Sequence, residues 1–337
     1  MKYLVTGGAG FIGSAFVRML IAGDRGDVVN LDKLTYAGNL ENLAPIAGDR
    51  RYRFVHGDIC DGPFVDALVA ETRPDAIVNF AAESHVDRSL LDPDAFVETN
   101  VRGTFTLLEA ARRHGTPRFL HVSTDEVYGS IEAPQEASES DLLRPSSPYS
   151  ASKAGSDLLA LSYFATFKMP VIVTRASNNY GPYQFPEKLI PLMIANAIED
   201  KPLPIYGDGM QIRDWLYVDD HCRAILAAIE RGRPGEIYNI GGSRALPNVE
   251  VVRKILAALG KPESLMQTVT DRPGHDRRYA LTSAKLMRET GWQAQVPFEQ
   301  GLQSTVEWYR SNPAWVAHVR SGEYLKYYEK NYAGRAV

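Results

Sequence analysis

The first half of the chain alternates short apolar runs with helical patterns, and this alternation constrains the fold more than any other feature. The apolar runs predict strands at residues 3–6, 28–31, 53–56, 76–80, 119–123 and 171–175. The stretches between them predict helices at residues 12–22, 64–71, 95–113 and 149–167. Strands that alternate with helices are typical of a parallel sheet covered by helices on both faces. Because the crossovers between such strands are right-handed, we expect an α/β fold with a Rossmann-type doubly wound parallel sheet.

After residue 175 the pattern changes, because a series of prolines breaks the chain into short pieces with aromatic and basic residues between them. Residues 218–230 and 236–240 then read as an amphipathic helix and another buried strand, so the chain is expected to return to the sheet. A helical pattern at residues 248–259 opens a smaller C-terminal α/β lobe that would bind substrate. This predicts one domain from residues 1–177 and 217–242, and a second from residues 178–216 and 243–337.

The composition excludes several classes of protein. The chain has 337 residues, of which 45% are hydrophobic and 23% charged, and its net charge of −4 gives no nucleic-acid footprint. No apolar run approaches the ~20 residues of a membrane span, and no secretory segment precedes the first strand. The two cysteines, Cys60 and Cys222, lack metal-binding spacing and predict reduced thiols. We therefore expect a cytoplasmic protein with no nucleic acid, membrane or metal among its partners.

A glycine-rich turn joins the first predicted strand to the first helix. It reads Thr6-Gly-Gly-Ala-Gly-Phe-Ile-Gly13, and its glycines permit a tight turn and the close approach of a pyrophosphate to the helix N-terminus. Asp32 closes the second strand about 20 residues further on, where a carboxylate binds the hydroxyls of an adenosine ribose. A 2′-phosphate would meet this charge, so Asp32 favours NAD over NADP, whereas the neighbouring Lys33 weakens that preference. The turn alone would also fit an ordinary strand–helix connection.

The ends of later strands predict the rest of a dinucleotide site. Asp58-Ile59 follows the third strand and could face the adenine, although it also fits a surface turn. The sequence Phe80-Ala-Ala-Glu-Ser84 follows the fourth strand with small residues that suit close packing on the ribose and pyrophosphate. Thr99-Asn100, in the next helix, is expected to support that loop.

The fifth strand ends in Thr124-Asp125-Glu126, and Tyr149 and Lys153 begin the next helix. A tyrosine and a lysine four residues apart lie on one helical face, where the ammonium is expected to hold the phenol's pKa below about 10. Such a pair takes a proton from a substrate hydroxyl while NAD takes the hydride. Alcohol oxidation needs no further acid or base, so the adjacent carboxylates indicate a second proton-transfer step, with elimination of water as the candidate. A solvated turn or a helix N-cap would also explain them.

These motifs resemble the dTDP-glucose 4,6-dehydratases of the extended short-chain dehydrogenase/reductase superfamily. The matching segments are TGGAGFIGS, DKLTYAGN, HGDIC, AAESHVDRS, STDEVYG, SPYSASKAGSD, SNNYGPYQFPEKLIPL, LPIYGDG, RDWLYVDDHCRA, YNIGG, DRPGHDRRYA and the C-terminal NYAGR. STDEVYG is the most specific, since related sugar-nucleotide epimerases share the glycine turn and the Tyr-x-x-x-Lys pair but lack the adjacent Asp and Glu. Residues 114–119 and 130–143 form shorter stretches than in many members. This difference affects the expected loop contacts and leaves the expected chemistry unchanged.

The resemblance implies a reaction and a role for each catalytic residue. Tyr149 would take the proton of the glucose C4 hydroxyl as hydride passes to NAD, and Glu126 would then remove the C5 proton of the keto sugar. Asp125 would protonate the departing C6 hydroxyl, and the same cofactor would return its hydride to C6. These roles need a neutral Asp125 and an ionised Glu126. The implied catalytic set is Thr124, Asp125, Glu126, Tyr149 and Lys153.

The resemblance also implies binding residues and a partner subunit. The expected cofactor-binding residues are Gly7, Gly10, Phe11, Ile12, Gly13, Asp32, Lys33, Leu34, Thr35, Asp58, Ile59, Phe80, Ala81, Ala82, Ser84, Thr99, Tyr149, Lys153 and Asn179. The expected substrate-binding residues are Ser84, Thr124, Asn178, Lys188, Arg213, Asn248, Arg272, His275 and Tyr332. The cations in the second set suit a diphosphate. A homodimer, joined by a four-helix bundle from residues 95–113 and 149–167, is implied as well.

Other functions remain open from the sequence. A sugar-nucleotide 4-epimerase would retain the C6 oxygen and rotate the keto intermediate. A 4,6-dehydratase could instead act on a UDP-sugar, because thymidine is implied by resemblance alone. A non-catalytic binding protein on this fold would have a broken catalytic set, and the intact Thr124, Tyr149 and Lys153 argue against it.

Overall fold

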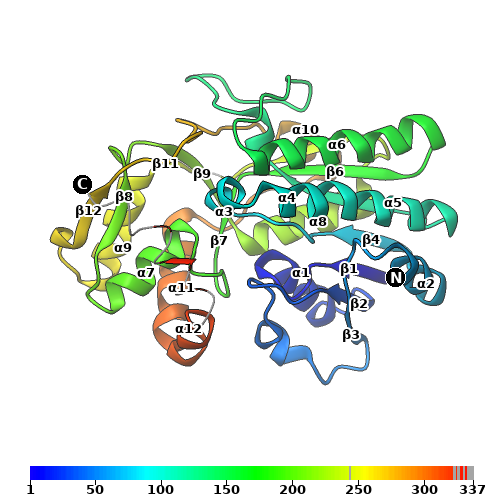
Figure 1. The fold of residues 1–337 in the computed structure, drawn as a ribbon, viewed down its shortest axis with the longest axis horizontal. Coiled ribbons are helices and arrows are strands. Elements are labelled where there is room, and N and C mark those ends of the chain that lie inside the picture. Colours follow the sequence, from blue (N-terminus) through cyan, green and yellow to red (C-terminus); the bar gives the residue numbers. More distant parts are fainter. Residues whose placement is uncertain (243, 322–323, 325–326, 329–330, 332–337) are drawn as a thin grey trace.

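The central element of the computed structural model is a seven-stranded, fully parallel sheet (Figure 1). The structure describes residues 1–242, 244–321, 324, 327–328 and 331. In spatial order the strands are β10 (Ile237–Ile240), β6 (Val171–Ala176), β5 (Phe119–Thr124), β4 (Ala76–Asn79), β1 (Lys2–Thr6), β2 (Asp27–Asp32) and β3 (Tyr52–His56). The predicted doubly wound α/β fold is confirmed, including the return of residues 236–240 to the sheet. The strand order reverses between β1 and β4, which is where such sheets bind ligands.

Helices cover both faces of this sheet because each presents one apolar side to it. On one face, α1 (Phe11–Ala22) and α8 (Val218–Arg231) bury Phe16, Leu20 and Ile225 in a common core. On the other face, α2 (Gly62–Thr72), α5 (Thr104–Arg113) and α6 (Pro148–Phe167) form a second core with the sheet. Figure 1 shows α5 and α6 running side by side along that second face.

The single helix expected at residues 95–113 is divided in the structure. It consists of α4 (Pro93–Phe96), a π-helical segment η2 (Val97–Gly103) and α5, and α3 (Val86–Leu91) precedes it. The wider π turn lets Asn100 clamp the loop after β4, since its side chain accepts from Glu83 N (2.9 Å) and donates to Glu83 O (3.0 Å). Sequence periodicity does not resolve such a turn, and π segments occur mostly at functional sites. The expected support of this loop by Asn100 is confirmed.

A smaller lobe with its own core lies at the carboxyl ends of the strands (Figure 1). Its strands are β7 (Asn178–Tyr180), β9 (Ile212–Tyr217) and β11 (Ala245–Pro247) in one sheet, and β8 (Leu203–Tyr206) and β12 (Met266–Val269) in another. Its helices are α7 (Leu189–Ile198), α9 (Asn248–Leu259), α11 (Phe298–Ser311) and α12 (Pro313–Val319). The helix α10 (Ala284–Thr290) packs back against α8 and β10. Short 3-10 turns lie at η1 (Leu40–Ile46), η3 (Asp125–Tyr128) and η4 (Glu263–Leu265). None of the helices in the described part of the chain has the length and apolarity that a membrane crossing requires.

Candidate active site

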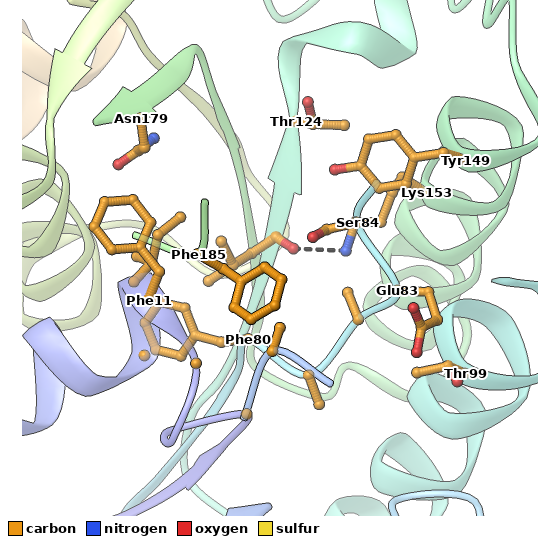
Figure 2. A pocket seen from close by; sticks show the side chains of 18 of the residues that line it. Phe11, Phe80, Glu83, Ser84, Thr99, Thr124, Tyr149, Lys153, Asn179 and Phe185 are labelled. Atoms are coloured by element: carbon orange, nitrogen blue, oxygen red, sulfur yellow. Dashed lines mark hydrogen bonds between the residues drawn. The ribbon is translucent and has the colours of Figure 1, made fainter. Parts of the chain in front are cut away.

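A cavity of about 490 Å³ opens where the strands end and the smaller lobe begins. Its wall combines the glycine turn after β1, the carboxyl ends of the neighbouring strands, the first turns of α6 and residues 176–190. Figure 2 shows Thr124, Tyr149 and Lys153 gathered on one side of this cavity and Phe11 and Phe80 on the other. The cavity therefore joins the predicted cofactor and catalytic residues in one space.

The glycine turn lines this cavity with bare backbone. Gly7 has a φ of +68°, and a Cβ there would lie 2.6 Å from the backbone nitrogen of Ala81. A Cβ on Gly13 would lie 2.3 Å from Gly7 O. Only glycine allows this close packing of the turn, the loop after β4 and the first turn of α1. The cradle leaves backbone N–H groups near a helix N-terminus, which fits the pyrophosphate of a dinucleotide.

Asp32 ends β2 in a buried position beside the glycine turn. Its carboxylate accepts from Ala9 N and Leu34 N, both at 2.8 Å, and burial raises its pKa against the effect of these bonds. Each oxygen keeps a further acceptor position that a ribose hydroxyl would fill. The neighbouring Lys33 pairs with Asp58 at 2.6 Å, so its charge is already matched within the protein. These residues fit NAD. Because the Lys33 charge is paired with Asp58, Lys33 no longer weakens the preference for NAD over NADP.

Nearly all the predicted cofactor residues line the cavity, and Leu34 is the exception. The Leu34 side chain packs against the core beneath the glycine turn instead, while its backbone serves Asp32. Its φ of +54° turns the chain at this point. The resemblance placed Leu34 among the cofactor contacts. In the structure its backbone N–H instead donates to Asp32, a contact that does not depend on the side-chain type.

The catalytic tyrosine is placed by the start of α6. Ser147 caps this helix in a reciprocal capping box with Ser150, which fixes Tyr149 in the first turn. The Lys153 ammonium, one turn later, donates to Val122 O at 2.7 Å. Because β5 carries Val122 and ends at Thr124, helix and strand hold the phenol, the ammonium and the threonine hydroxyl together.

The expected lowering of the tyrosine pKa is wrong for this structure. Burial raises the pKa of Tyr149, and the Glu126 carboxylate raises it further, whereas the Thr124 hydroxyl opposes them. Burial also lowers the pKa of Lys153 to about 8, and Asp157 opposes that shift. Sequence spacing brings Tyr149 and Lys153 to one face of α6, but it does not count the carboxylates and the desolvation that the tertiary fold adds.

The two carboxyl groups after β5 have different surroundings. Asp125 is buried, and its Oδ2 has no hydrogen-bond partner among the described residues. Burial raises the pKa of Asp125 well above its usual value, with the charge of Glu126 adding to the effect. Glu126 is only half-buried, and its Oε2 accepts from the Tyr279 hydroxyl at 3.4 Å. Burial therefore favours the neutral acid at Asp125, beside the more accessible Glu126, which is the arrangement that an acid and a base at one site require.

Part of the predicted substrate set also lies in the cavity. Ser84, Thr124, Asn178 and Lys188 line its wall. Lys188 donates to Ser84 O at 2.6 Å, and burial lowers the pKa of its ammonium. This bond ties the smaller lobe to the loop after β4 across the cavity.

The other predicted substrate residues lie outside the cavity wall. The buried Arg213 stacks on the Tyr279 ring at 4.2 Å, and burial lowers the pKa of its guanidinium while the charge of Glu126 opposes that shift. Arg272 pairs with Asp87 at 3.3 Å, and His275 pairs with Asp271 at 2.6 Å. Asn248 starts α9 with a buried Oδ1 that has no partner in the described part. Tyr332 falls outside the described residues.

Several cavity residues were missed by sequence reasoning. They include Ala95, Glu98, Ser177, Gln184, Phe185, Glu187, Trp215 and His221. Glu187 is the most connected of them, because it accepts from Tyr36 (3.1 Å) and from Arg88 (3.0 Å). The His85 ring also contacts the backbone carbonyl of Glu187 at 3.2 Å, so His85 and Arg88 both support the cavity wall through this residue. The one sequence signal for Glu187 was its position next to Lys188, a predicted substrate-binding residue.

The described residues contain no group of three metal-ligating side chains that could hold an ion. Within those residues, both Cys60 and Cys222 are free thiols. Burial raises the pKa of Cys60 to about 12, so this thiol is protonated at neutral pH.

Comparison with known proteins places the chain in a family. The model of the GDP-mannose 4,6 dehydratase family matches residues 4–305. A dTDP-glucose 4,6-dehydratase of Shigella flexneri is 52% identical over 360 aligned positions, and the alignment covers 99% of this chain and 100% of that protein. One of Xanthomonas campestris pv. campestris is 54% identical over 341 residues, with 96% and 97% covered.

Solved structures agree with this placement. A dTDP-glucose 4,6-dehydratase from Streptomyces venezuelae, with NAD and dTDP bound, superimposes with a TM-score of 0.93 at 52% identity, covering 95% of this chain and 100% of that one. A UDP-glucose 4-epimerase of Thermus thermophilus in complex with NAD reaches 0.86 at 33% identity, covering 93% and 100%. The Asp125–Glu126 pair and the higher identity both favour the dehydratases. The chain belongs to the dTDP-glucose 4,6-dehydratase family of the short-chain dehydrogenase/reductase superfamily.

Proposed function

We propose that the protein converts dTDP-glucose to dTDP-4-keto-6-deoxyglucose and water, as an NAD-dependent hydro-lyase that holds its cofactor throughout the cycle. The observation that carries this proposal is the buried Asp125, whose pKa burial raises well above its usual value, next to Glu126 at the same cavity as Tyr149. An epimerase needs the tyrosine and the cofactor but no such acid–base pair. The likeness to dehydratases at 52% identity supports the same choice.

The first chemical step belongs to Tyr149. NAD, when bound, takes a hydride from C4 of the sugar and returns it to C6. Tyr149 takes the proton of the C4 hydroxyl, with the Thr124 hydroxyl as a second partner for the same oxygen. Because burial and Glu126 raise the pKa of Tyr149, the Lys153 ammonium must offset them to favour the phenolate.

The second step belongs to the carboxyl pair. Once C4 is a ketone, the neighbouring C5 proton is acidic, and the Glu126 carboxylate removes it. Asp125 donates its proton to the C6 oxygen, which leaves as water. When the hydride returns to C6, Glu126 gives its proton back to C5. Tyr149 then releases the proton of the C4 hydroxyl and Asp125 regains one by exchange with solvent, so both groups are ready for the next cycle. Arg213 lies close enough for its charge to favour an ionised carboxylate at this site.

Cofactor and substrate would divide the cavity between them. The proposed NAD contacts are the predicted set in the glycine turn and strand ends, with Asp32 at the ribose. The nucleotide sugar would then extend past Lys188 toward Arg213, Arg272 and His275, whose cations suit a diphosphate. The proposed domains follow this division: residues 1–177 and 217–242 for NAD, and residues 178–216 and 243–337 for the sugar nucleotide. The separate core of the smaller lobe supports this division, whereas Leu286 on α10 and Trp292 pack in the core of the first domain.

The protein is further proposed to be a cytoplasmic homodimer. Large apolar side chains stay exposed along α3 to α6, namely Leu90, Leu91, Val97, Phe105, Leu158 and Phe167. An exposed apolar face of this kind is typical of a subunit interface. NAD and nucleotide sugars are intracellular metabolites, and the free thiols of Cys60 and Cys222 suit the same compartment.

The experiment that tests this function compares two substrates. Purified protein is incubated with dTDP-glucose and, separately, with UDP-glucose, and the alkaline absorbance of a 4-keto-6-deoxy product is measured. We expect the product from dTDP-glucose without stoichiometric added NAD. Formation of the C4 epimer would instead support the epimerase, and faster turnover of UDP-glucose would reassign the nucleobase.

A further inference from the structure

A chain of buried polar side chains crosses the central sheet beneath the active site. It starts at Thr6 on β1, whose hydroxyl donates to Asn79 Oδ1 on β4 at 2.7 Å. The Asn79 amide nitrogen then lies 3.2 Å from His121 Nδ1 on β5. The three residues are neighbours in the strand register, and all are buried. The chain therefore connects the strand of the glycine turn to the strand that contacts Lys153.

These partners fix the tautomer of His121. Asn79 accepts from Thr6 through its carbonyl oxygen, so it offers an N–H to His121, and Nδ1 is the acceptor. The ring proton is then on Nε2, which donates to Ser156 Oγ at 3.0 Å, and Ser156 donates to Lys153 O at 2.9 Å. Burial and the Lys153 charge lower the pKa of His121 well below its usual value. The imidazole is neutral and carries no charge toward Lys153.

A buried ion pair lies on the other side of this imidazole. Asp157 follows Lys153 by four residues in α6, so both side chains lie on one helical face. Asp157 Oδ2 accepts from Arg175 Nε at 2.8 Å, and both residues are at most 2% exposed. His121 Nε2 lies 3.7 Å from Asp157 Oδ1 and 3.4 Å from Lys153 Nζ. The neutral ring is thus packed between a carboxylate and the catalytic ammonium.

We propose that Asp157 is a positioning residue for the reaction, the buried counter-charge that keeps Lys153 protonated while Tyr149 accepts the substrate proton. The immediate hydrogen-bond acceptor of Lys153 is a neutral carbonyl, Val122 O at 2.7 Å, which adds no charge. Burial alone would favour loss of the ammonium proton, and the Asp157 carboxylate opposes it. Burial raises the pKa of Asp157, but the guanidinium of Arg175, which cannot lose its own proton, opposes that shift and favours the carboxylate.

Other charged groups around α6 do not replace Asp157. The adjoining elements carry His121, Asp125, Glu126, Arg175, Asp87, Arg88, Asp94, Glu98, Arg102, Glu109, Arg112 and Arg113. Within the described part of the chain, Asp157 is the charged group that raises the pKa of Lys153. Burial lowers the pKa of His121 and raises that of Asp125, so it favours the neutral form of both, and Glu126 acts on Tyr149 instead. Arg175 is paired with Asp157 through the bond from its Nε.

The test removes the carboxylate charge of residue 157 while it keeps the size and shape of the side chain. Asp157→Asn removes the carboxylate, and the double variant Asp157→Asn/Arg175→Met also removes the buried cation that would otherwise lack a charged partner. Asp157→Glu keeps the charge. The matched control is Tyr128→Phe, which breaks the 2.8 Å bond from Arg175 to the Tyr128 hydroxyl but leaves Asp157 ionised. Each holoenzyme is mixed with dTDP-glucose, and the rate at which reduced cofactor forms is measured against pH, together with the melting temperature.

The inference rests on the proposed function, and the two fail differently. The wild-type rate should fall at alkaline pH as Lys153 loses its proton, and in both Asp157→Asn variants this fall should move at least about one pH unit lower. Asp157→Glu should restore the profile, and Tyr128→Phe should lower only the melting temperature. Profiles that superimpose on the wild type in both Asp157→Asn variants would overturn the role of Asp157, as would an equal shift in Tyr128→Phe. Absence of reduced cofactor in the wild type at every pH would reject the proposed function instead.

Discussion

The Tyr279 hydroxyl lies 3.4 Å from the Glu126 carboxylate, so a residue far along the chain contacts the proposed base for the C5 proton. The one proton of this hydroxyl is shared with Asp276, which lies closer at 2.8 Å, and Arg213 stacks on the ring. We expect Tyr279→Phe to slow elimination by less than about tenfold, since an unshared bond to a charged group contributes about 1.5 kcal/mol or more. Oxidation at C4 should keep its rate. Rapid mixing with dTDP-glucose separates the two steps, and equal slowing of both would contradict this role.

The two half-reactions should respond to different substitutions. Tyr149→Phe removes the first base and should suppress all chemistry by about 10²–10⁴-fold. Glu126→Gln and Asp125→Asn act after the ketone exists, so both variants should accumulate enzyme-bound reduced cofactor. Glu126→Gln should also lose exchange of the C5 hydrogen with solvent deuterium. The assignment fails if Tyr149→Phe builds up reduced cofactor as they do, or if both carboxyl variants turn over normally.

The raised pKa of Asp125 predicts how stability depends on pH. The folded state keeps this proton to a higher pH than the unfolded chain does, so the wild type loses stability as pH rises from about 4 toward the folded pKa. Asp125→Asn has no such proton and should therefore melt progressively higher than the wild type across that range. Melting temperatures at several pH values check this, with Leu142→Gln on the exposed loop as control. A constant difference between the two proteins would contradict the buried, protonated acid.

Cofactor retention should depend on Asp32. Because hydride returns within each turnover, NAD should co-purify with the protein and activity should need no stoichiometric addition. Asp32→Ala removes the ribose acceptor and frees Ala9 N and Leu34 N, so the variant should lose NAD on dilution. Lys33→Ala is the matched control, since it changes the neighbouring charge and leaves these bonds in place. Equal use of NADP by the wild type would refute the interpretation of Asp32.

The proposed dimer can be tested with surface variants that leave the fold of the subunit intact. Light scattering should give a particle of twice the 37.3 kDa chain at micromolar concentration. Leu158→Glu places a charge on an α6 side chain that is 60% exposed, and should shift the protein toward the monomer. Leu142→Glu changes a side chain that is 73% exposed in the loop before α6, outside these helices, and should leave the dimer intact. A wild-type particle of 37.3 kDa would reject the dimer.

The sequence by itself determined the order of strands and helices, because the period of apolar residues is a local property. It also determined the glycine turn, Asp32 and the Tyr149–Lys153 pair, since each is a short motif placed at a strand end. The sequence resembled a family closely enough to imply the reaction, and the comparisons confirm that family. Local periodicity missed the π segment at η2, where Asn100 bonds to a distant loop.

Only the tertiary structure decided the electrostatics of the site. The pKa of Tyr149 is raised rather than lowered because burial and Glu126 act on it through space, and neither effect is visible in a spacing of four residues. The contacts of Glu126 with Tyr279 and of Lys153 with His121 join residues from separate parts of the chain. Desolvation and charge depend on what surrounds a group in three dimensions, so the sequence names the chemical groups and the fold sets their protonation.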